Sequence, residues 1–299
     1  MTAPAPGTAE WQRLVTASKV AAIVGLSPWD SPRSVWHLLR GEIPSDDGRN
    51  MAAKSRGQYL ENGILDWWVD QHLGVDLHTA AVVTRQYYAT RDDLPWAAAT
   101  PDLATRLRDV GLVVVDAKTA RDDDEWGTPG TDEVPAYYAA QLQWSMHLAG
   151  ARRGYIALLT SRLDLREYVL DYDEVTARTL ESICRAFWES TKDPDGAPPI
   201  DDTVATFQTL KRLHPDIDRD AAVELDEEVA REFVAATTGL KAAEAADRLA
   251  RSTVLGLMGD ARLATYDGVT ICRRQPNAYG ISLVPVAKTI PTRDKENAA

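Results

Sequence analysis

The stretch Gly111-Leu112-Val113-Val114-Val115-Asp116-Ala117-Lys118 joins an apolar run to a carboxylate and an ammonium two positions apart. Because β-branched side chains suit a pleated surface, the run predicts a buried strand. Asp116 and Lys118 then project from one face at the end of a rigid element, and Ala117 projects from the other. Two charges buried near a sheet need compensation. A divalent metal beside Asp116 and a phosphate or activated water beside Lys118 would provide it.

The tripeptide Thr100-Pro101-Asp102 ends fourteen residues before Asp116. Taken alone, Pro-Asp is a frequent turn dipeptide, and Asp-x-Lys occurs often by chance. Their order carries more information than either one, because a connection and an apolar strand separate P-D from D-x-K. A structural role and a functional role both stay open at this point.

An amphipathic helix is predicted upstream of these segments. Its i, i+4, i+7 pattern is formed by Leu60, Ile64, Trp67, Trp68 and Gln71. Glu61 lies at the edge of the apolar face. It is either a solvated carboxylate, the usual fate of a helix glutamate, or a carboxylate delivered to a metal from a packed helix.

A further helix is predicted from Pro135 to Leu148, since Pro135 suits a first helical turn. Tyr138 and Gln141 are three positions apart and share one face of this helix. Their spacing alone favours packing at the edge of the core over a functional role.

Five ordered segments together resemble the YqaJ-type viral recombinase family, relatives of the lambda-phage exonuclease among the PD-(D/E)xK nucleases. The segments are residues 16–29, Arg56-Gly57…Leu60-Glu61, Thr100-Pro101-Asp102, Asp116-Ala117-Lys118 and Pro135…Tyr138…Gln141. The resemblance spans residues 11 to 172. It implies a metal-dependent hydrolase, a DNA-binding exonuclease that digests linear duplex DNA from an end.

Members of this family typically digest one strand 5′ to 3′ and leave a 3′ overhang for DNA recombination through a single-strand annealing protein. Lambda-type relatives also favour a closed homo-oligomeric ring around the DNA. One alternative is a structure- or sequence-specific endonuclease on the same core. Another is a non-catalytic, nuclease-derived DNA-binding module, which would lack one of the acidic residues or the lysine.

The resemblance also assigns roles by position. Asp102 and Asp116 would be metal ligands, helped by the Ala117 carbonyl. Glu61 would be a further acidic ligand or would orient water on the metal. Lys118 would position or deprotonate the attacking water.

Other positions correspond to contacts with DNA in the family. Tyr138 and Gln141 would support the site or touch the DNA backbone, and Ser18 and Thr100 fall where the family contacts a terminal 5′ phosphate. The family usually carries an arginine upstream of this serine, but Trp11 stands in that place here. The side chains expected to contact DNA or phosphate are Arg13, Ser18, Arg56, Thr100, Tyr138 and Gln141.

Phosphodiester hydrolysis needs a nucleophile aimed in line and neutralised charge on the phosphate, and cations held by carboxylates serve both needs. Mg²⁺ prefers oxygen ligands, so it is the expected cofactor, with Mn²⁺ as a substitute. No zinc pattern of the Cys₂His₂ or HExxH type competes for it. The absence of a Walker motif argues against ATP. The two cysteines, Cys184 and Cys272, are too few for an iron–sulfur cluster.

The formal net charge of −12 argues against indiscriminate coating of DNA. A focused basic channel within an acidic exterior would still act locally, over a Debye length of about 10 Å. Its candidate members are Lys54, Arg56, Arg106, Arg108, Arg121, Arg152 and Arg153. The sequence shows no signal peptide and no apolar run of membrane-spanning length, so we expect no membrane partner and a cytoplasmic protein, in the host cytoplasm if phage-encoded.

The predicted order α-β-β-β-α-β-β gives an α/β (α+β) fold, a restriction-endonuclease-like core whose mixed central sheet is flanked by helices. The expected strands are residues 82–89, 94–100, 112–118, 155–160 and 165–171. Residues 119–134 form a polar loop that should overhang the site. Trp126 in this loop is either a base-stacking wedge or, as we favour, a packed anchor.

The predicted domain organisation has five parts. They are a disordered start (1–9), the nuclease core (10–192), a Pro-rich linker (193–200), a C-terminal extension (201–288) and a tail (289–299). Within the extension we expect a helix over residues 227–252 and a β-hairpin formed by residues 266–274 and 281–286.

Overall fold

The computed structural model describes residues 4, 8–44, 51–74, 83–278 and 280–290, and divides the chain into two compact units, Met1–Ile217 and Asp218–Ala299. The expected disordered start and tail lie mostly outside the described residues, as do the first residue of the strand expected at 82–89 and the side chain of Lys54. None of the described helices is both long and apolar enough to span a bilayer.

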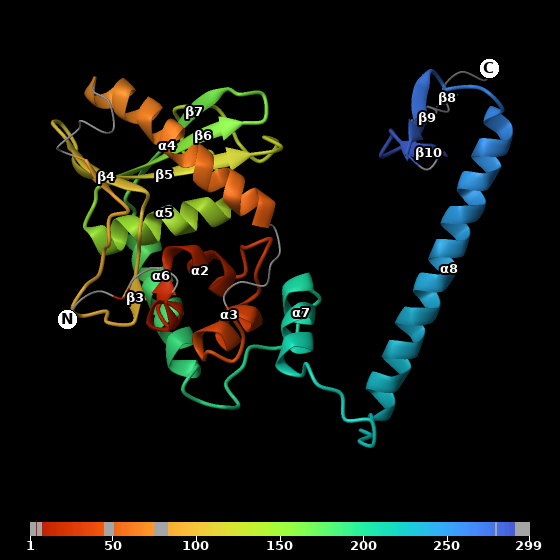
Figure 1. Cartoon of the computed structure of the whole chain (residues 1–299), viewed down its shortest axis with the longest axis horizontal. Coiled ribbons are helices and arrows are strands. Elements are labelled where there is room, and N and C mark those ends of the chain that lie inside the picture. Colours follow the sequence, from red (N-terminus) through yellow and green to blue (C-terminus); the bar gives the residue numbers. More distant parts are fainter. Residues whose placement is uncertain (1–3, 5–7, 45–50, 75–82, 279, 291–299) are drawn as a thin grey trace, which may run out of the picture. The chain divides into compact units, whose positions relative to one another are not determined.

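The first unit is built on a five-stranded mixed sheet (Figure 1). In sheet order the strands are β2 (Thr84–Arg85), β4 (Leu103–Leu107), β5 (Gly111–Ala120), β6 (Arg153–Thr160) and β7 (Leu165–Asp171). Neighbouring strands run antiparallel except β5 and β6, which run parallel. A parallel neighbour needs a crossover, and helix α5 (Ala136–Ala149) supplies it. The α/β class with a mixed central sheet between helices is confirmed.

Helices cover both faces of this sheet (Figure 1). Helix α4 (Met51–Leu73) packs on one face and α5 packs on the other. The first unit also contains α1 (Ala9–Gln12), α2 (Ala17–Ile23), α3 (Pro32–Leu39), α6 (Glu174–Ser190) and α7 (Val204–Leu213). Val113 and Val115 pack in one cluster with α4, whereas Val114 packs in another with α5. This split follows from the two-residue alternation of a strand. It places Asp116 and Lys118 on the α5 face.

Strand β4 was missed by the sequence prediction, which treated the residues after Asp102 as a connection. Leu103, Ala104 and Thr105 are buried, and β4 forms an antiparallel hairpin with β5. Gly111 follows the turn with a φ of +90°, a conformation that costs glycine little. Because Pro101-Asp102 is typical of a turn, the sequence prediction missed the short strand that follows it. The residues of this strand are buried because they pair with β5.

The two strands expected before β4 were predicted too long. Only Thr84–Arg85 joins the main sheet, while β3 (Ala97–Ala98) pairs in parallel with β1 (Val15–Thr16). Ala89 and Ala99 form an isolated bridge. Strand β3 packs against α5, where the Trp144 indole donates a hydrogen bond to the Ala98 carbonyl. Because β3 is held by this helix, it does not join the main sheet.

Helix α4 contains the predicted Glu61 helix and ends at Leu73, but its buried face differs from the expected one. The buried side chains are Ile64, Leu65, Trp68 and Val69, while Gln71 is exposed and Leu60 lies at the exposed margin. The prediction had included Leu60 and Gln71 because both fit helical spacing. Tertiary contact with the sheet, rather than spacing, decides which of these residues is covered.

The second unit contains α8 (Glu227–Met258) and an antiparallel sheet in the order β10-β9-β8. Its strands are β8 (Leu263–Tyr266), β9 (Val269–Asn277) and β10 (Gly280–Pro285). The expected hairpin therefore gains a third strand. Helix α7 packs in the first unit, where Thr206 shares a buried 2.7 Å hydrogen bond with Ser31, the N-cap residue of α3. The division into a core ending at residue 192 and an extension starting at residue 201 stays a prediction.

Close packing of α5 on the sheet can be tested at Gly154 of β6. A Cβ added there would lie 2.6 Å from Cγ of the fully buried Leu142. We expect Gly154→Ala to lower the free energy of unfolding by about 1–3 kcal/mol through overpacking. Gly63 of α4 meets nothing within 4 Å. As the control, Gly63→Ala should raise stability by about 0.5–1 kcal/mol in the same denaturant titration.

Candidate active site

Three of the four predicted catalytic side chains meet where β5 extends past the beginning of β4. The β4–β5 ladder starts at the pair Leu103–Val115, so Asp102 stands just beyond it, opposite Asp116. The Asp102 carboxylate accepts a 2.8 Å hydrogen bond from the Ala117 backbone N–H. The Lys118 ammonium donates to Asp116 across 3.3 Å. The D-x-K segment and the P-D dipeptide are therefore joined by direct contact.

Helix α5 adds two side chains to this group. Gln141 donates from Nε2 to Oδ2 of Asp116 across 2.9 Å. The Lys118 ammonium lies 5.3 Å from the centre of the Tyr138 ring. Tyr138 and Gln141 do share a helical face, and that face contacts Asp116 and Lys118. Their spacing alone had favoured simple core packing.

Glu61 approaches the group from α4 without joining it. Its carboxylate accepts a 3.1 Å hydrogen bond from Gln86. Its charge contributes to the raised pKa of Asp102. Within the residues that the structure describes, no three Asp, Glu, His or Cys side chains form a ready-made metal-binding group. A ligand role for Glu61 therefore stays a prediction.

The predicted phosphate contacts are spread over several elements. Ser18, at the start of α2, shares a 3.2 Å hydrogen bond with Thr16. The Thr100 hydroxyl is buried and finds no hydrogen-bond partner among the described residues. Arg13 and Arg56 are exposed.

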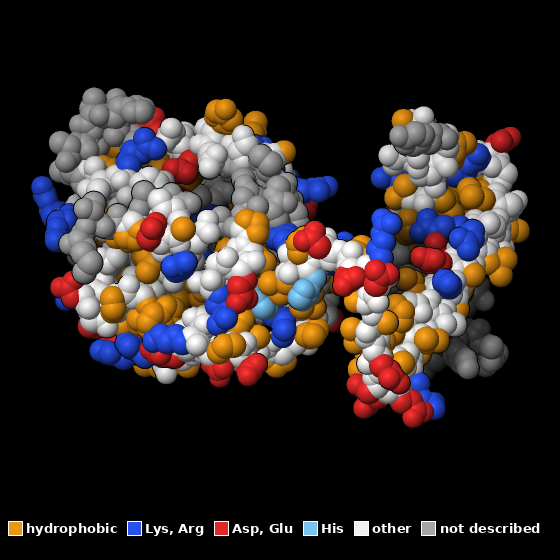
Figure 2. Space-filling view, turned by 60° about the horizontal axis from the view of Figure 1, so that its bottom comes forward, with side chains coloured by type: hydrophobic (Ala, Val, Ile, Leu, Met, Phe, Trp, Pro, Cys, Tyr) orange, Lys and Arg blue, Asp and Glu red, His pale blue; other side chains and the backbone are white. Residues whose placement is uncertain are grey.

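Basic residues are not gathered on the face shown in Figure 2, where acidic and basic side chains are interspersed over the first unit. Arg106, Arg108 and Arg121 are exposed singly. Arg153 pairs with Asp171 across 2.7 Å. The focused basic channel stays a prediction.

Burial makes the carboxylate pair electrostatically strained. Desolvation, together with the charges of Asp116 and Glu61, raises the pKa of Asp102 to about 7 against the opposing effect of Lys118. For Lys118, burial alone lowers the pKa, but attraction to Asp116 and Asp102 outweighs it and the net shift is upward. A divalent cation between the carboxylates would relieve their repulsion.

The oxygens at this site fit a hard cation. Asp102 and Asp116 offer carboxylate oxygens, and the Ala117 carbonyl leaves β5 on the same edge as the N–H bound by Asp102. No cysteine or histidine contacts the pair among the described residues, so the donors are those that Mg²⁺ prefers over softer metals.

Two supporting residues escaped the sequence prediction. Lys19 is partly buried and donates to the carbonyls of Gln12 and Leu14 across 2.7 and 2.6 Å, tying the chain before β1 to the helix that carries Ser18. Burial lowers the pKa of Lys19 to about 7. Gln86 binds Glu61. Spacing could not reveal either contact, because each joins separate elements.

Part of the chain, including the whole candidate site, matches the model of a known protein family. Residues 10–152 match the model of the YqaJ-like viral recombinase domain. This range contains every predicted catalytic residue. A comparison with curated proteins gives no significant match.

Several solved exonucleases overlap with the chain at low identity. An alkaline exonuclease (LHK-Exo) from Laribacter hongkongensis is 17% identical, with a TM-score of 0.43, covering 60% of this chain and 89% of that one. LHK-Exo in complex with dAMP is 18% identical, with a TM-score of 0.46, covering 69% of this chain and 95% of that one. A phage related exonuclease from Haemophilus somnus is 13% identical, with a TM-score of 0.40, covering 59% of this chain and 93% of that one.

The raised pKa of Asp102 predicts a pH dependence of stability. Its ordinary value is 3.8, so between that pH and about 7 the folded state binds the proton more tightly than the unfolded state does. In metal-free buffer this stabilisation is present below about pH 4 and is lost as the pH rises through about 7. Asp102→Asn stays neutral and should exceed wild type in unfolding free energy above pH 7, by on the order of 1–4 kcal/mol.

Chemical denaturation with a chelator, repeated from about pH 4 to pH 9, measures this difference. Added Mg²⁺ should stabilise wild type more than Asp102→Asn, because a ligand stabilises the state that binds it. Parallel pH profiles for the two proteins would contradict the electrostatic account of the site.

Proposed function

We propose that this nuclease, whose residues 10–152 match the YqaJ-like viral recombinase domain, is a phage-type, Mg²⁺-dependent exonuclease. In this proposal it digests linear duplex DNA 5′ to 3′ and leaves 3′ overhangs for a single-strand annealing protein. The observation that carries the proposal is the pair Asp102–Asp116 held beside Lys118 at one strand edge.

The cation would be held by Asp102 and Asp116 with the Ala117 carbonyl, and Glu61 would approach from α4. When bound, Mg²⁺ supplies charge neutralisation at the phosphate and activates the attacking water. Mn²⁺ shares the preference for oxygen donors and should substitute.

The protein's own groups position the reactants. Gln141 restrains the Asp116 carboxylate, and the Ala117 N–H restrains Asp102, so both oxygens are preorganised before a cation arrives. The upward pKa shift of Lys118 supports a charged amine that donates to a phosphate oxygen. Ser18 and the unpartnered Thr100 hydroxyl would receive the terminal 5′ phosphate, with Arg13 nearby in sequence.

Two parts of the proposal concern assembly. A ring of identical chains around the duplex would keep the enzyme on its substrate between cuts. The annealing protein would then receive the exposed strand directly. Both follow from the family rather than from a contact in this chain.

Substitution of the central residues tests the catalytic assignment. We expect Asp102→Asn, Asp116→Asn and Lys118→Ala each to reduce digestion of linear duplex by more than about 100-fold, since each removes charge stabilisation from the transition state. Circular dichroism should show that the fold is kept. Asp109, an exposed carboxylate in the β4–β5 turn, provides the control Asp109→Asn, which should stay active. Wild-type turnover in any of the first three variants would remove that residue from the mechanism.

Polarity and end recognition are tested with end-labelled linear duplex in Mg²⁺, comparing 5′-phosphate with 5′-hydroxyl ends. We expect faster digestion of phosphorylated ends and release of nucleotides from the 5′ strand. Ser18→Ala and Thr100→Val should each reduce the preference for phosphorylated ends, while the hydroxyl-ended substrate is cut as before. Cleavage of covalently closed circular duplex would favour the endonuclease alternative instead.

A further inference from the structure

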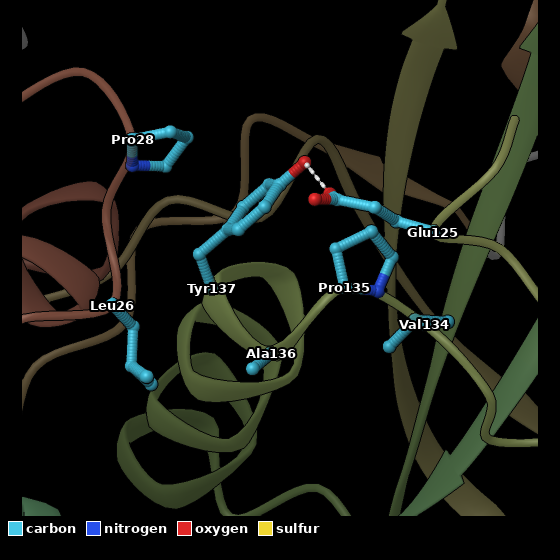
Figure 3. Close-up of a pocket in the computed structure, with 7 residues that line it drawn as sticks. All are labelled: Leu26, Pro28, Glu125, Val134, Pro135, Ala136 and Tyr137. Carbon is cyan, nitrogen blue, oxygen red and sulfur yellow. Dashed lines mark hydrogen bonds between the residues drawn. The ribbon is translucent and has the colours of Figure 1, made fainter. Parts of the chain in front are cut away.

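The hollow beside the candidate site belongs to the part of the chain that matches the family model. It has a volume of about 420 Å³ and lies between Leu26 and Pro28 on one side and Val134 and Pro135 on the other (Figure 3). More than half of the large apolar side chains that are exposed among the described residues lie elsewhere, in the second unit. That unit contains none of the proposed catalytic residues, so its apolar surface needs another explanation.

Helix α8 carries an apolar stripe along one face. Its members are four and three residues apart in turn: Val229, Phe233, Ala236, Leu240 and Ala243. This alternation keeps the side chains on one face, as in the seam of a coiled coil. Val229 is 47% exposed, Phe233 67% and Leu240 62%. Three large apolar side chains of a single helix therefore face solvent on the same side.

The same face of α8 is covered at its C-terminal end. Arg251 donates to the Leu283 carbonyl of β10 across 3.0 Å, Val254 is half-buried and Met258 is buried. These positions continue the spacing of the stripe after Asp247. The sheet β8–β10 lies beside this end, and no other described element of the second unit lies along the rest of the helix (Figure 1). One face of α8 is thus packed at its end and open over the stripe.

The side-chain sizes along the stripe fit a second copy of α8 that runs in the opposite direction. When the pair is centred near position 238, Phe233 of one copy lies level with Ala243 of the other, and Leu240 lies level with Ala236. Each large side chain then meets a small one, so the two helices can interdigitate closely. A parallel pair would instead set Phe233 against Phe233 and Asp247 against Asp247, which places two like charges in the seam.

The charges of the second unit favour the same orientation. Residues 218–232 hold seven aspartates and glutamates against two arginines, whereas residues 241–290 hold seven lysines and arginines against four acidic residues. In an antiparallel pair Arg248 of one copy comes level with Glu228 of the other, so a basic end meets an acidic beginning. Parallel pairing would bring like charges together at both ends.

We propose that α8 is the contact through which two copies of this chain pair, antiparallel and centred near position 238. The overlap from Val229 to Asp247 is about 28 Å long at 1.5 Å per residue. Beyond it, the sheet of one copy comes level with the acidic residues 218–228 of the other. The contact is isologous, so both ends gain the same attraction. It joins two nuclease cores through their extensions and is independent of the proposed catalytic site.

The mass of the full chain in solution tests the pairing. Leu240→Glu places a charge in the seam and should weaken the pairing at least about 100-fold, because a buried charge without a partner is costly. The matched control is Leu249→Glu. Leu249 is 70% exposed and lies nine residues further along, two and a half turns, on the opposite side of α8. In sedimentation equilibrium, wild type and Leu249→Glu should have at least twice the mass of Leu240→Glu at equal concentration.

Two further readouts separate lost pairing from lost folding and from lost catalysis. Circular dichroism should show equal helix content in the two variants, since both leucines are exposed. Leu240→Glu should still digest linear duplex in Mg²⁺ if wild type does, because residue 240 lies outside the candidate site. Equal masses for wild type and Leu240→Glu, as expected if α8 serves a different protein, would overturn the proposal.

Disulfide cross-linking tests the orientation. Val229 of one copy comes level with Asp247 of the other only in the antiparallel pair. A mixture of Val229→Cys and Asp247→Cys proteins should therefore form a cross-linked dimer at least about 10-fold faster than either protein alone, because a disulfide needs Cα atoms within about 7 Å. The native thiols, Cys184 and Cys272, are buried, and wild type measures their background. A mixture that cross-links no faster than its components would overturn the antiparallel pairing.

Discussion

The hydrogen bond from the Ala117 N–H to the Asp102 carboxylate is the contact on which the site depends. It continues the β4–β5 pairing by one step after the backbone ladder has ended at Leu103. The Asp102 side chain thereby binds the N–H of β5 that lies beyond the paired part of β4, and its carboxylate is held near Asp116. Two carboxylates would otherwise separate, because their charges repel in a buried place. The hairpin overcomes this repulsion by geometry, and the result is a pair of preorganised carboxylates at the place where we propose that a cation binds.

The rest of the first unit keeps this arrangement rigid. Strand β5 has α4 on one face and α5 on the other, so its alternating side chains serve two cores while Asp116 and Lys118 emerge on the α5 side. The crossover through α5 is also what delivers Gln141 and Tyr138 to the same place. The crossover that the parallel pairing of β5 and β6 requires therefore also supplies residues of the site. Glu61 comes from α4, on the opposite face of the sheet, and its carboxylate accepts a hydrogen bond from Gln86.

A row of aromatic rings joins the loop after the D-x-K segment to the segment between α2 and α3. Trp126 is the packed anchor that its sequence context favoured, and its ring begins a row that ends at the exposed Trp29. Trp29 comes from the segment between α2 and α3, far from the D-x-K motif in sequence, and nothing in local pattern connects the two. Their proximity arises because α2 packs on α5.

Local sequence determined the elements whose side chains follow a strong period or motif. The valine run predicted β5 and the shared face of Asp116 and Lys118, and the ordered segments predicted the family whose model matches residues 10–152. Sequence alone missed β4 and extended the strands before it, since the burial of a short strand depends on a partner elsewhere in the chain. Only the tertiary structure decided that Asp102 binds the Ala117 N–H, that Gln141 binds Asp116, that Glu61 turns to Gln86 and that Trp29 reaches Tyr137. Each of these contacts joins residues on different elements, and their energies depend on distances that spacing along the chain does not encode.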